Sequence, residues 1–310
     1  MYSTFNRTRK GFWFGTEQRM QWFQTPLAGA DTSPTGWNAS GTTLNGGGFE
    51  LNSFGSHKVY RYEWSGNSAR ETAQLMKSYA DGSYGRGLIY FIDPLTYSTN
   101  VLPARLADPS MALGYEGGSL VYGLQPTGTP VALNQNNLPV SSASYNMATT
   151  AVGFRGKQDA VFVPIPEGYT LVLGAMYTFT ESGGVFASPQ NTSGTVLAAQ
   201  KLTALAASSA NVVVDKFSNV SGVWLWVGKS AAGAATVNLN AMVGRLIETD
   251  QVTNNTPTYQ ELLRGPWIGG QGHSGCRFSG KPTYIEYGGV NDGQIGFAAT
   301  FREVGSWAFG

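Results

Sequence analysis

The sequence predicts a mainly β protein that contains one convincing helix, and three observations support this class. Glycine accounts for 41 of the 310 residues, which suits a chain with many tight turns. Charged residues make up only 13% and aromatic residues another 13%, whereas an average soluble domain is roughly 25% charged. Short apolar or alternating segments recur between glycine- and proline-rich turns, as the strands of sandwiches and barrels do.

The helix is expected between Ser68 and Gly82. Ser68 and Glu71 have the spacing of a capping box, in which the two side chains bind backbone amides at the start of a helix. Gly82 supplies the left-handed residue that commonly follows a helix end. The residues that recur at helical spacing on one face are Thr72, Leu75, Met76, Tyr79 and Ala80. The apolar run 88–92, which precedes Asp93-Pro94, predicts a short buried strand.

Alternating strands are expected near both ends of the chain. Gly11–Gly15 and Met20–Thr25 are short and aromatic, and Lys58–Trp64 carries aromatic residues at positions 60, 62 and 64. That alternation is typical of a half-buried strand. Gln294–Val304 alternates in the same way. We therefore expect the C-terminal segment to return to the first domain, so that the domain between them is an insertion.

The inserted domain is expected to be a β-sandwich or jelly roll spanning residues 125–264, and residues 1–124 with 265–310 form the other domain. A polar, proline-rich segment after Leu124 indicates the boundary. Regularly spaced strand segments follow, separated by turns; they are Asp159–Pro164, Tyr169–Thr180, Val196–Gln200, Asn211–Phe217, Gly222–Gly228 and Thr236–Ile247. Lys201–Ser209 has the composition of a short helix.

Composition excludes several classes of protein. The formal net charge is +1 and the sequence pI is about 7.8, so the basic footprint of a nucleic-acid-binding protein is missing and no recognition of a nucleic-acid sequence is expected. Cys276 is the one cysteine, which rules out an internal disulfide. No apolar stretch approaches about 20 residues, and no signal peptide is recognisable. We expect a protein without a membrane span that is made and assembled inside a cell.

The residues that carry catalysis or bind metals are scarce, and we expect neither an enzyme nor a cofactor or metal site. His273 and Cys276 lie close in sequence but lack an orienting third group. Residues 270–275 match G-x-G-x-x-G, yet a strand pattern follows where a dinucleotide site needs a helix. A glycosidase would need paired carboxylates, whereas the acidic residues of the sandwich are scattered: Glu167, Glu181, Asp215, Glu248 and Asp250.

Aromatic residues of the sandwich are the candidate binding residues. Trp224 and Trp226 share one face of Gly222–Gly228, and Tyr177 shares a face of its strand with Tyr169 and Phe179. Sugars dock their apolar faces on exposed aromatic rings, so Trp224, Trp226 and Tyr177 are candidate glycan-binding residues. Packing in a core or an interface is the favoured alternative, because tryptophan is highly buried on average.

Four segments carry a resemblance to a known family. Residues 58–66, 73–112, 272–287 and 296–307 resemble the minor tail proteins of long-tailed (siphovirus-type) phages. The likeness is closest to the distal tail type of phages that infect actinobacterial hosts. It covers about half of the chain, at both ends. It is most specific in the unit of strand, capped helix and strand.

The resemblance implies a fold, an assembly and a place in the virion. The first domain would be a split β-barrel with one flanking helix, similar to a tail-tube subunit, and the sandwich would be galectin-like or carbohydrate-binding-like. The protein would form a homo-oligomeric ring at the virion tail tip, with a hexamer favoured over a trimer. Its partners would be the tail tube protein and other tail-tip or baseplate proteins. The alternative function is a carbohydrate-binding module that attaches the virion to a host cell-wall glycan.

Overall fold

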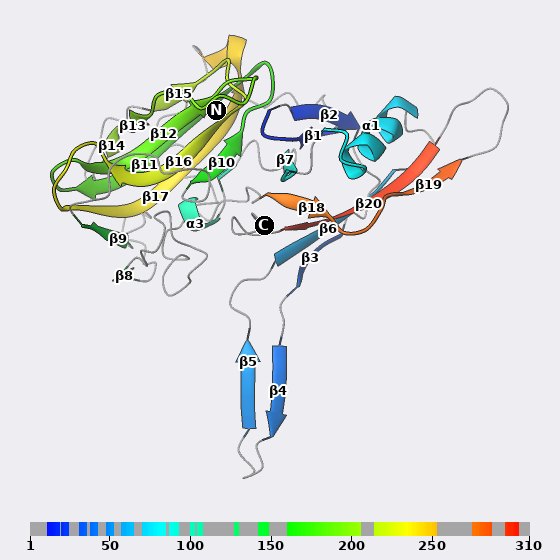
Figure 1. Ribbon diagram of the computed structural model, residues 1–310, viewed down its shortest axis with the longest axis horizontal. Coiled ribbons are helices and arrows are strands. Elements are labelled where there is room, and N and C mark those ends of the chain that lie inside the picture. The colour runs from blue at the N-terminus through cyan, green and yellow to red at the C-terminus, as the bar shows by residue number, and fades with distance from the viewer. Residues whose placement is uncertain are drawn as a thin grey trace, which may run out of the picture. The chain divides into compact units, whose positions relative to one another are not determined.

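The fold is mainly β, which confirms the predicted class (Figure 1). The computed structural model describes residues 11–18, 20–24, 31–35, 38–42, 48–52, 57–64, 70–84, 87–92, 100–102, 104–107, 127–129, 142–148, 160–205, 214–252, 275–286 and 295–303. No helix among these residues is long and apolar enough to cross a membrane.

The chain divides into two compact units. The first comprises Met1–Trp22, Ile89–Ser274 and Phe309–Gly310, and the second comprises Phe23–Leu88 and Gly275–Ala308. These limits differ from the predicted boundaries at 124/125 and 264/265, because the segment after Leu88 belongs with the sandwich rather than with the helix. Pairing explains the difference: strand β7 (Tyr90–Ile92) pairs with β1 (Gly11–Gly15) of the first unit.

The first unit contains a sandwich of two sheets, whose strands pair antiparallel except for the parallel pair β11–β14. The four-stranded sheet has the order β10-β16-β12-β13, and the six-stranded sheet has the order β14-β11-β17-β9-β8, with β15 also on β11. The strands are β8 (Thr127–Thr129), β9 (Ser142–Met147), β10 (Val161–Pro164), β11 (Tyr169–Phe179), β12 (Gly183–Gln190), β13 (Gln200–Lys201), β14 (Ala204–Leu205), β15 (Asp215–Phe217), β16 (Gly222–Lys229) and β17 (Ala235–Glu248). A 3-10 turn, η4 (Thr249–Gln251), follows β17. The short helix considered for Lys201–Ser209 is wrong where the structure describes it, because residues 200–201 and 204–205 are strands.

The sandwich core lies between the two sheets. A Cβ atom placed on Gly183 in β12 would approach Val237 and Ala235 in β17, so the odd-numbered residues of β12 face the six-stranded sheet. Its cross-strand neighbours on β16 share that face. The apolar residues there are almost fully buried; they are Val185, Ala187, Val223, Leu225, Val227, Val237 and Leu239.

A short segment closes the edge of β17 that β9 leaves uncovered. β9 pairs with residues 235–239 only. Further along β17, the buried Asn100 donates its amide N–H to Met242 O at 3.1 Å, and its Oδ1 accepts from Gly244 N at 3.0 Å. Val101 N donates to Gly244 O at 3.0 Å. The helical turn α3 (Ala104–Ala107) then packs against β17.

The strands near the N-terminus form a small sheet, and the division between the two units falls within one of them, after Trp22. β2 (Met20–Gln24), β1 and β7 make a three-stranded sheet in the order β2-β1-β7. The ring of Trp13 in β1 meets the ring of Tyr169 in β11 edge-on, with 5.8 Å between centroids. This contact packs the small sheet against the sandwich within the first unit.

The second unit contains a five-stranded sheet and a separate strand pair. The sheet runs β18-β20-β6-β3, with β19 also on β20, and β4 pairs with β5. The strands are β3 (Asp31–Thr35), β4 (Asn38–Thr42), β5 (Gly48–Asn52), β6 (His57–Trp64), β18 (Cys276–Phe278), β19 (Thr283–Glu286) and β20 (Ile295–Glu303). Because β20 pairs with β6, residues 295–303 share a sheet with residues 57–64. A split β-barrel stays a prediction.

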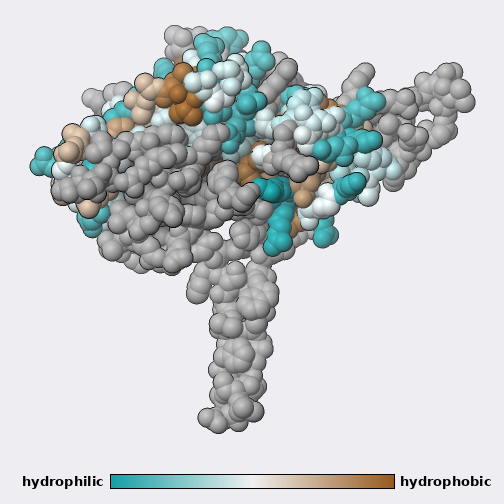
Figure 2. All heavy atoms as spheres, viewed as in Figure 1, coloured by the Kyte–Doolittle hydropathy of each residue, from teal (hydrophilic) through white to brown (hydrophobic). Residues whose placement is uncertain are grey.

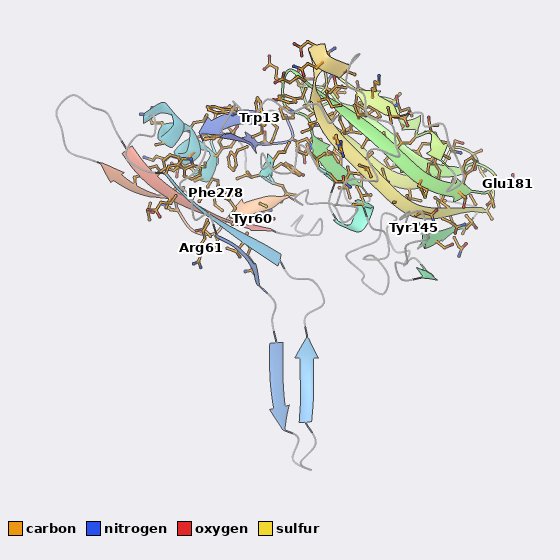
Figure 3. The ribbon with its side chains drawn as sticks, turned by 180° about the vertical axis from the view of Figure 1, so that it is seen from behind. Trp13, Tyr60, Arg61, Tyr145, Glu181 and Phe278 are labelled. Carbon is orange, nitrogen blue, oxygen red and sulfur yellow. The ribbon has the colours of Figure 1, made fainter. Side chains whose placement is uncertain are left out.

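One face of this sheet carries a layer of aromatic side chains. Trp64 stacks on Phe297 with 4.3 Å between ring centroids, and Phe278 lies 4.8 Å from Phe301. Figure 3 shows Arg61 on the opposite side of the sheet from Tyr60, and Arg61 is exposed while Tyr60 is 2% exposed. The alternation of β6 therefore separates a buried face from a solvated one, as its sequence predicts.

Helix α1 (Arg70–Ala80) packs against β20. Its most buried residues are Ala73, Met76 and Tyr79, whereas Leu75 and Ala80 of the predicted face are only partly buried. The helix ends at Ala80, and Gly82 just beyond it has φ = 79°. Gly82 N donates to Tyr79 O and Ser83 N donates to Ser78 O, which is the Schellman arrangement. The predicted capping serine, Ser68, lies outside the described residues.

Candidate functional site

The predicted aromatic platform is buried. Trp224 is 1% exposed, Trp226 4% and Tyr177 1%. All eight residues of β16 are buried, so both faces of this strand are covered. The two tryptophans and Tyr177 therefore present no surface on which a sugar ring could stack. This corrects the glycan-binding assignment of these three residues and favours the alternative, core packing.

The polar atoms of the two indole rings have partners inside the first unit. Trp224 Nε1 donates to Gln190 Oε1 at 2.9 Å, and Trp226 Nε1 donates to Ser188 Oγ at 3.0 Å. Gln190 is fully buried, and its Nε2 donates to the backbone oxygen of Glu17 at 3.0 Å. A buried N–H must find an acceptor, and here the acceptors come from β12.

Aromatic neighbours fill the face of β16 that carries the tryptophans. Phe162 lies 4.8 Å from Trp224, Tyr90 lies 5.1 Å from Phe162, and Phe186 stacks on Trp226 at 4.7 Å, all between ring centroids. Tyr90 belongs to β7, so the segment after Leu88 helps to bury the ring of Phe162. The glycines that flank the tryptophans are the sequence signal for this packing. A Cβ atom on Gly228 would lie 2.1 Å from a ring carbon of Trp226.

Tyr177 holds the segment that follows β13 in place by a hydrogen bond. Its hydroxyl donates to Leu202 O at 2.6 Å, and Leu202 N donates to Val185 O at 2.9 Å. Burial raises the pKa of Tyr177 to about 12; a backbone hydrogen bond to Val185 opposes this shift, and the charge of Asp215 adds to it. Tyr177 thus acts as a neutral hydrogen-bond donor in the core.

Few large hydrophobic side chains of the described residues are exposed. They are Trp22, Tyr84, Phe179 and Leu197, with exposed fractions between 41% and 48%. The face in Figure 2 agrees, since most of its coloured surface is teal or pale and brown is confined to small patches. Among the four, Phe179 stands out because a charged group contacts its ring.

Phe179 and Lys201 form a pair at one end of the sandwich. Lys201 Nζ lies 3.3 Å from the centroid of the Phe179 ring, a cation–π contact. Phe179 is 41% exposed and Lys201 is partly buried. Partial burial lowers the pKa of Lys201 by desolvation of its ammonium group. Sequence patterns indicated the facing of Phe179 in its strand but contained no signal for its contact with Lys201.

The segment that carries Lys201 is held by a carboxylate as well. Asp215 Oδ2 accepts from Thr203 N at 2.9 Å, and Asp215 Oδ1 accepts from Thr203 Oγ1 at 3.5 Å. Burial raises the pKa of Asp215, and the two hydrogen bonds from Thr203 oppose that rise. Asp215 therefore links β15 to the residues that follow β13 through these hydrogen bonds.

Another cation of the sandwich is fully buried. Lys229 is 0% exposed, and its Nζ donates to the backbone oxygens of Ala148 and Gly233. Both acceptors are main-chain atoms of neighbouring turns. The ammonium group thus ties the end of β9 to the turn between β16 and β17, which is a structural role.

The other residues considered for chemistry are not brought together in the described part of the chain. Cys276 is fully buried in β18, and His273 lies outside the described residues, as does most of the glycine-rich stretch 270–275. Among the residues that the structure describes, no group of three or more His, Cys, Asp or Glu side chains could hold a metal ion. Of the scattered acidic residues, Glu167 and Glu181 lie in exposed turns.

Comparisons with known proteins give distant likenesses only. No protein-family model matches the chain, and no curated protein matches it. The CBM22-1 xylan-binding domain of Xyn10C from Paenibacillus barcinonensis is 13% identical, with a TM-score of 0.25, over 42% of this chain and 92% of that one. The VP2 subviral particle of infectious bursal disease virus is 12% identical, with a TM-score of 0.21, over 95% of this chain and 76% of that one. With such TM-scores, neither likeness assigns a fold or a function.

Proposed function

We propose that this protein is a structural component of a phage tail tip, where it forms a ring that continues the tail tube and carries the sandwich as an appended domain. The proposal rests first on the resemblance of residues 58–66, 73–112, 272–287 and 296–307 to distal tail proteins. In the fold, segments from both ends of the chain meet in one sheet, since β6 pairs with β20 and β20 with β18. Parts of the segments 58–66, 272–287 and 296–307 thus fold together in one sheet, whereas residues 89–112 belong to the first unit.

The observation that carries the proposal is the strand pair β4–β5. Its residues pair with one another over five positions, from Asn38↔Asn52 to Thr42↔Gly48. Within the described part of the chain, neither strand pairs with any other strand. An isolated two-stranded hairpin is marginally stable in water. Strand addition by a neighbouring subunit would provide the missing hydrogen bonds, which is how a ring of such subunits could close.

The edges of the five-stranded sheet also favour the β4–β5 pair as the contact between subunits. β3 lies at one edge and contains Pro34, which has no N–H to donate to an added strand. β18, at the other edge, is three residues long. Both features discourage pairing along the sheet itself. The β4–β5 pair is therefore the better candidate for contact between subunits.

Native mass spectrometry with negative-stain imaging of the purified protein tests the ring. We expect a closed hexamer, with a trimer as the alternative stoichiometry. A particle that stays monomeric at every concentration would contradict a ring formed by this chain alone.

Proline substitutions in β4 test the role of the strand pair. Successive N–H groups of a strand alternate between its two edges, so Ala39→Pro and Ser40→Pro remove donors on opposite edges. We expect one of them to abolish the ring while the monomer stays folded. Ala39→Ser and Ser40→Ala keep both N–H groups and serve as matched controls. Rings from all four variants would exclude pairing through β4.

A further inference from the structure

An exposed aromatic ring beside a fixed ammonium group distinguishes one end of the sandwich. Phe179 ends β11, and the turn through Glu181 leads into β12; Figure 3 shows that turn at the tip of the sandwich. Lys201 Nζ is 3.3 Å from the centroid of the Phe179 ring. The ring nevertheless remains 41% exposed, so a second apolar group can still contact it.

The position of Lys201 is set before any ligand arrives. Its backbone belongs to β13, which pairs with β12 at Phe186↔Lys201. The next residue, Leu202, is 1% exposed and is fastened on both sides by Val185 and Tyr177. The side chain crosses Gly184, where a Cβ atom would come within 2.5 Å of the lysine Cε. A side chain at position 184 would therefore displace the side chain of Lys201 from this path.

The ammonium group of Lys201 has no carboxylate partner within ion-pair distance in the part of the chain that the structure describes. Asp215, in the neighbouring β15, already accepts two hydrogen bonds from Thr203. Desolvation lowers the pKa of Lys201, so its charged form would gain from a bound anion. A preorganised cation without a counter-ion can bind an anion with little loss of side-chain entropy.

Exposed residues capable of hydrogen bonding neighbour the pair in sequence, and Glu181 is the nearest acidic residue along the chain from Phe179. Thr178 and Thr180 flank Phe179 in sequence and are exposed, and Gln200 beside Lys201 is also exposed. The hydroxyl of Thr178 accepts from Asn238 at 3.4 Å and that of Thr180 accepts from Thr236 N at 2.9 Å, which leaves both O–H groups able to donate. Because side chains alternate along a strand, Thr178 and Gln200 face away from Phe179 and Lys201, so the ring and the ammonium group themselves make up the subsite.

We propose that Phe179 and Lys201 form a subsite for an acidic sugar, that is, a sugar ring that carries a carboxylate or a phosphate. The apolar face of the ring would pack on the exposed part of Phe179, and the anionic group would bind the Lys201 ammonium. The subsite uses none of the buried residues Trp224, Trp226 and Tyr177, and it does not depend on ring assembly.

Titration calorimetry of the full-length protein with defined oligosaccharides tests the subsite. The probes are an oligogalacturonate for the carboxylate, an oligomeric glycerol phosphate bearing glucose for the phosphate, and maltohexaose as the neutral probe. We expect at least one anionic probe to bind and the neutral one to bind at least about tenfold more weakly, since a charge-assisted hydrogen bond is worth that much. The probe that binds identifies the anionic group. Failure of both anionic probes, or equal affinity for maltohexaose, would overturn the proposal.

Matched variants separate this subsite from general attraction by charge. Lys201→Met keeps the apolar stem over Gly184 but removes the ammonium, and Phe179→Leu keeps an apolar side chain but removes the ring. Each should weaken binding about tenfold. Lys216→Met in β15 removes an exposed charge of the same sign elsewhere on the sandwich and should change affinity less than about twofold. Equal losses in Lys201→Met and Lys216→Met would refute the subsite, as would full affinity in Phe179→Leu.

Discussion

The indole N–H of Trp224 donates to the side-chain oxygen of Gln190 at 2.9 Å, and both side chains are almost fully buried. The same amide group donates to the backbone oxygen of Glu17. Gln190 therefore joins the tryptophan of β16 to the segment between β1 and β2. One amide satisfies polar groups of two chain segments that lie far apart in sequence.

Replacing Gln190 with leucine should lower the free energy of unfolding by about 3 kcal/mol, because it removes the acceptor of the Trp224 Nε1–H bond and the donor that reaches the Glu17 oxygen. Urea denaturation followed by tryptophan fluorescence measures the change. Gln200→Leu, at an exposed position, is the control and should change stability by less than about 0.5 kcal/mol. Equal effects of the two substitutions would show that the Gln190 bridge contributes nothing.

Trp226→Ala should destabilise the sandwich by about 3 to 5 kcal/mol, as expected for a large buried side chain. Trp226→Phe keeps the stacking on Phe186 but loses the hydrogen bond to Ser188, so it should be the milder change. Thermal unfolding of the two variants ranks them. Native stability of Trp226→Ala would indicate that the Trp226 side chain is not part of the core, and would support its assignment as a sugar-binding residue.

Asn100→Leu should cost about 3 kcal/mol, although leucine has a similar volume, because Gly244 N and Met242 O lose their partner at a buried strand edge. Hydrogen exchange gives a local readout, and the amide of Gly244 should lose protection while those of β16 keep theirs. Uniform loss of protection over the sandwich would instead indicate that Asn100 acts on the whole domain.

Glu181→Gly should stabilise the protein by about 1 kcal/mol, because Glu181 has φ = 50° and a side chain is strained there. Glu181→Ala removes the same charge and keeps a Cβ atom, so it should give no such gain. Comparing their melting temperatures isolates the backbone contribution. A gain in both variants would assign the effect to charge.

Tyr177 should make stability depend on pH in the alkaline range. Its pKa is about 12 in the folded protein and 10.0 in the unfolded chain, so the neutral hydroxyl stabilises the fold fully below pH 10. That contribution, about 2 kcal/mol, is lost as the pH rises from about 10 to 12. Tyr177→Phe should be less stable at pH 8 and should lose less stability between pH 9 and pH 11, as urea midpoints would show. Parallel pH profiles would contradict this.

Local patterns predicted the elements well where one face of a strand or helix is buried. The alternation of Lys58–Trp64 gave its buried and exposed faces, and Gly82 marked the helix end. Composition and turns likewise indicated several strands of the sandwich, but they missed β12 (Gly183–Gln190), and the strand predicted at Val196–Gln200 is wrong except at Gln200. These features depend on neighbours in sequence, which is why they could be inferred without a structure.

Contacts between distant segments could not be predicted in the same way. The division of the chain after Leu88 depends on the pairing of β7 with β1. The burial of Trp224 depends on cover from both sides of β16, and alternation alone does not distinguish a solvated face from a second packed layer. The contact of Lys201 with Phe179 joins two strands whose proximity no periodic pattern encodes.

The pairing of β6 with β20 also orders events during synthesis. A ribosome makes residues 57–64 long before residues 295–303, at about 5 to 20 residues per second. The sandwich between them can fold in the interval, before β20 has been made to cover the aromatic face of β6. Nascent chains therefore expose Tyr60, Tyr62 and Trp64 for many seconds, and a truncated chain that lacks residues 295–303 leaves them as a target for chaperones.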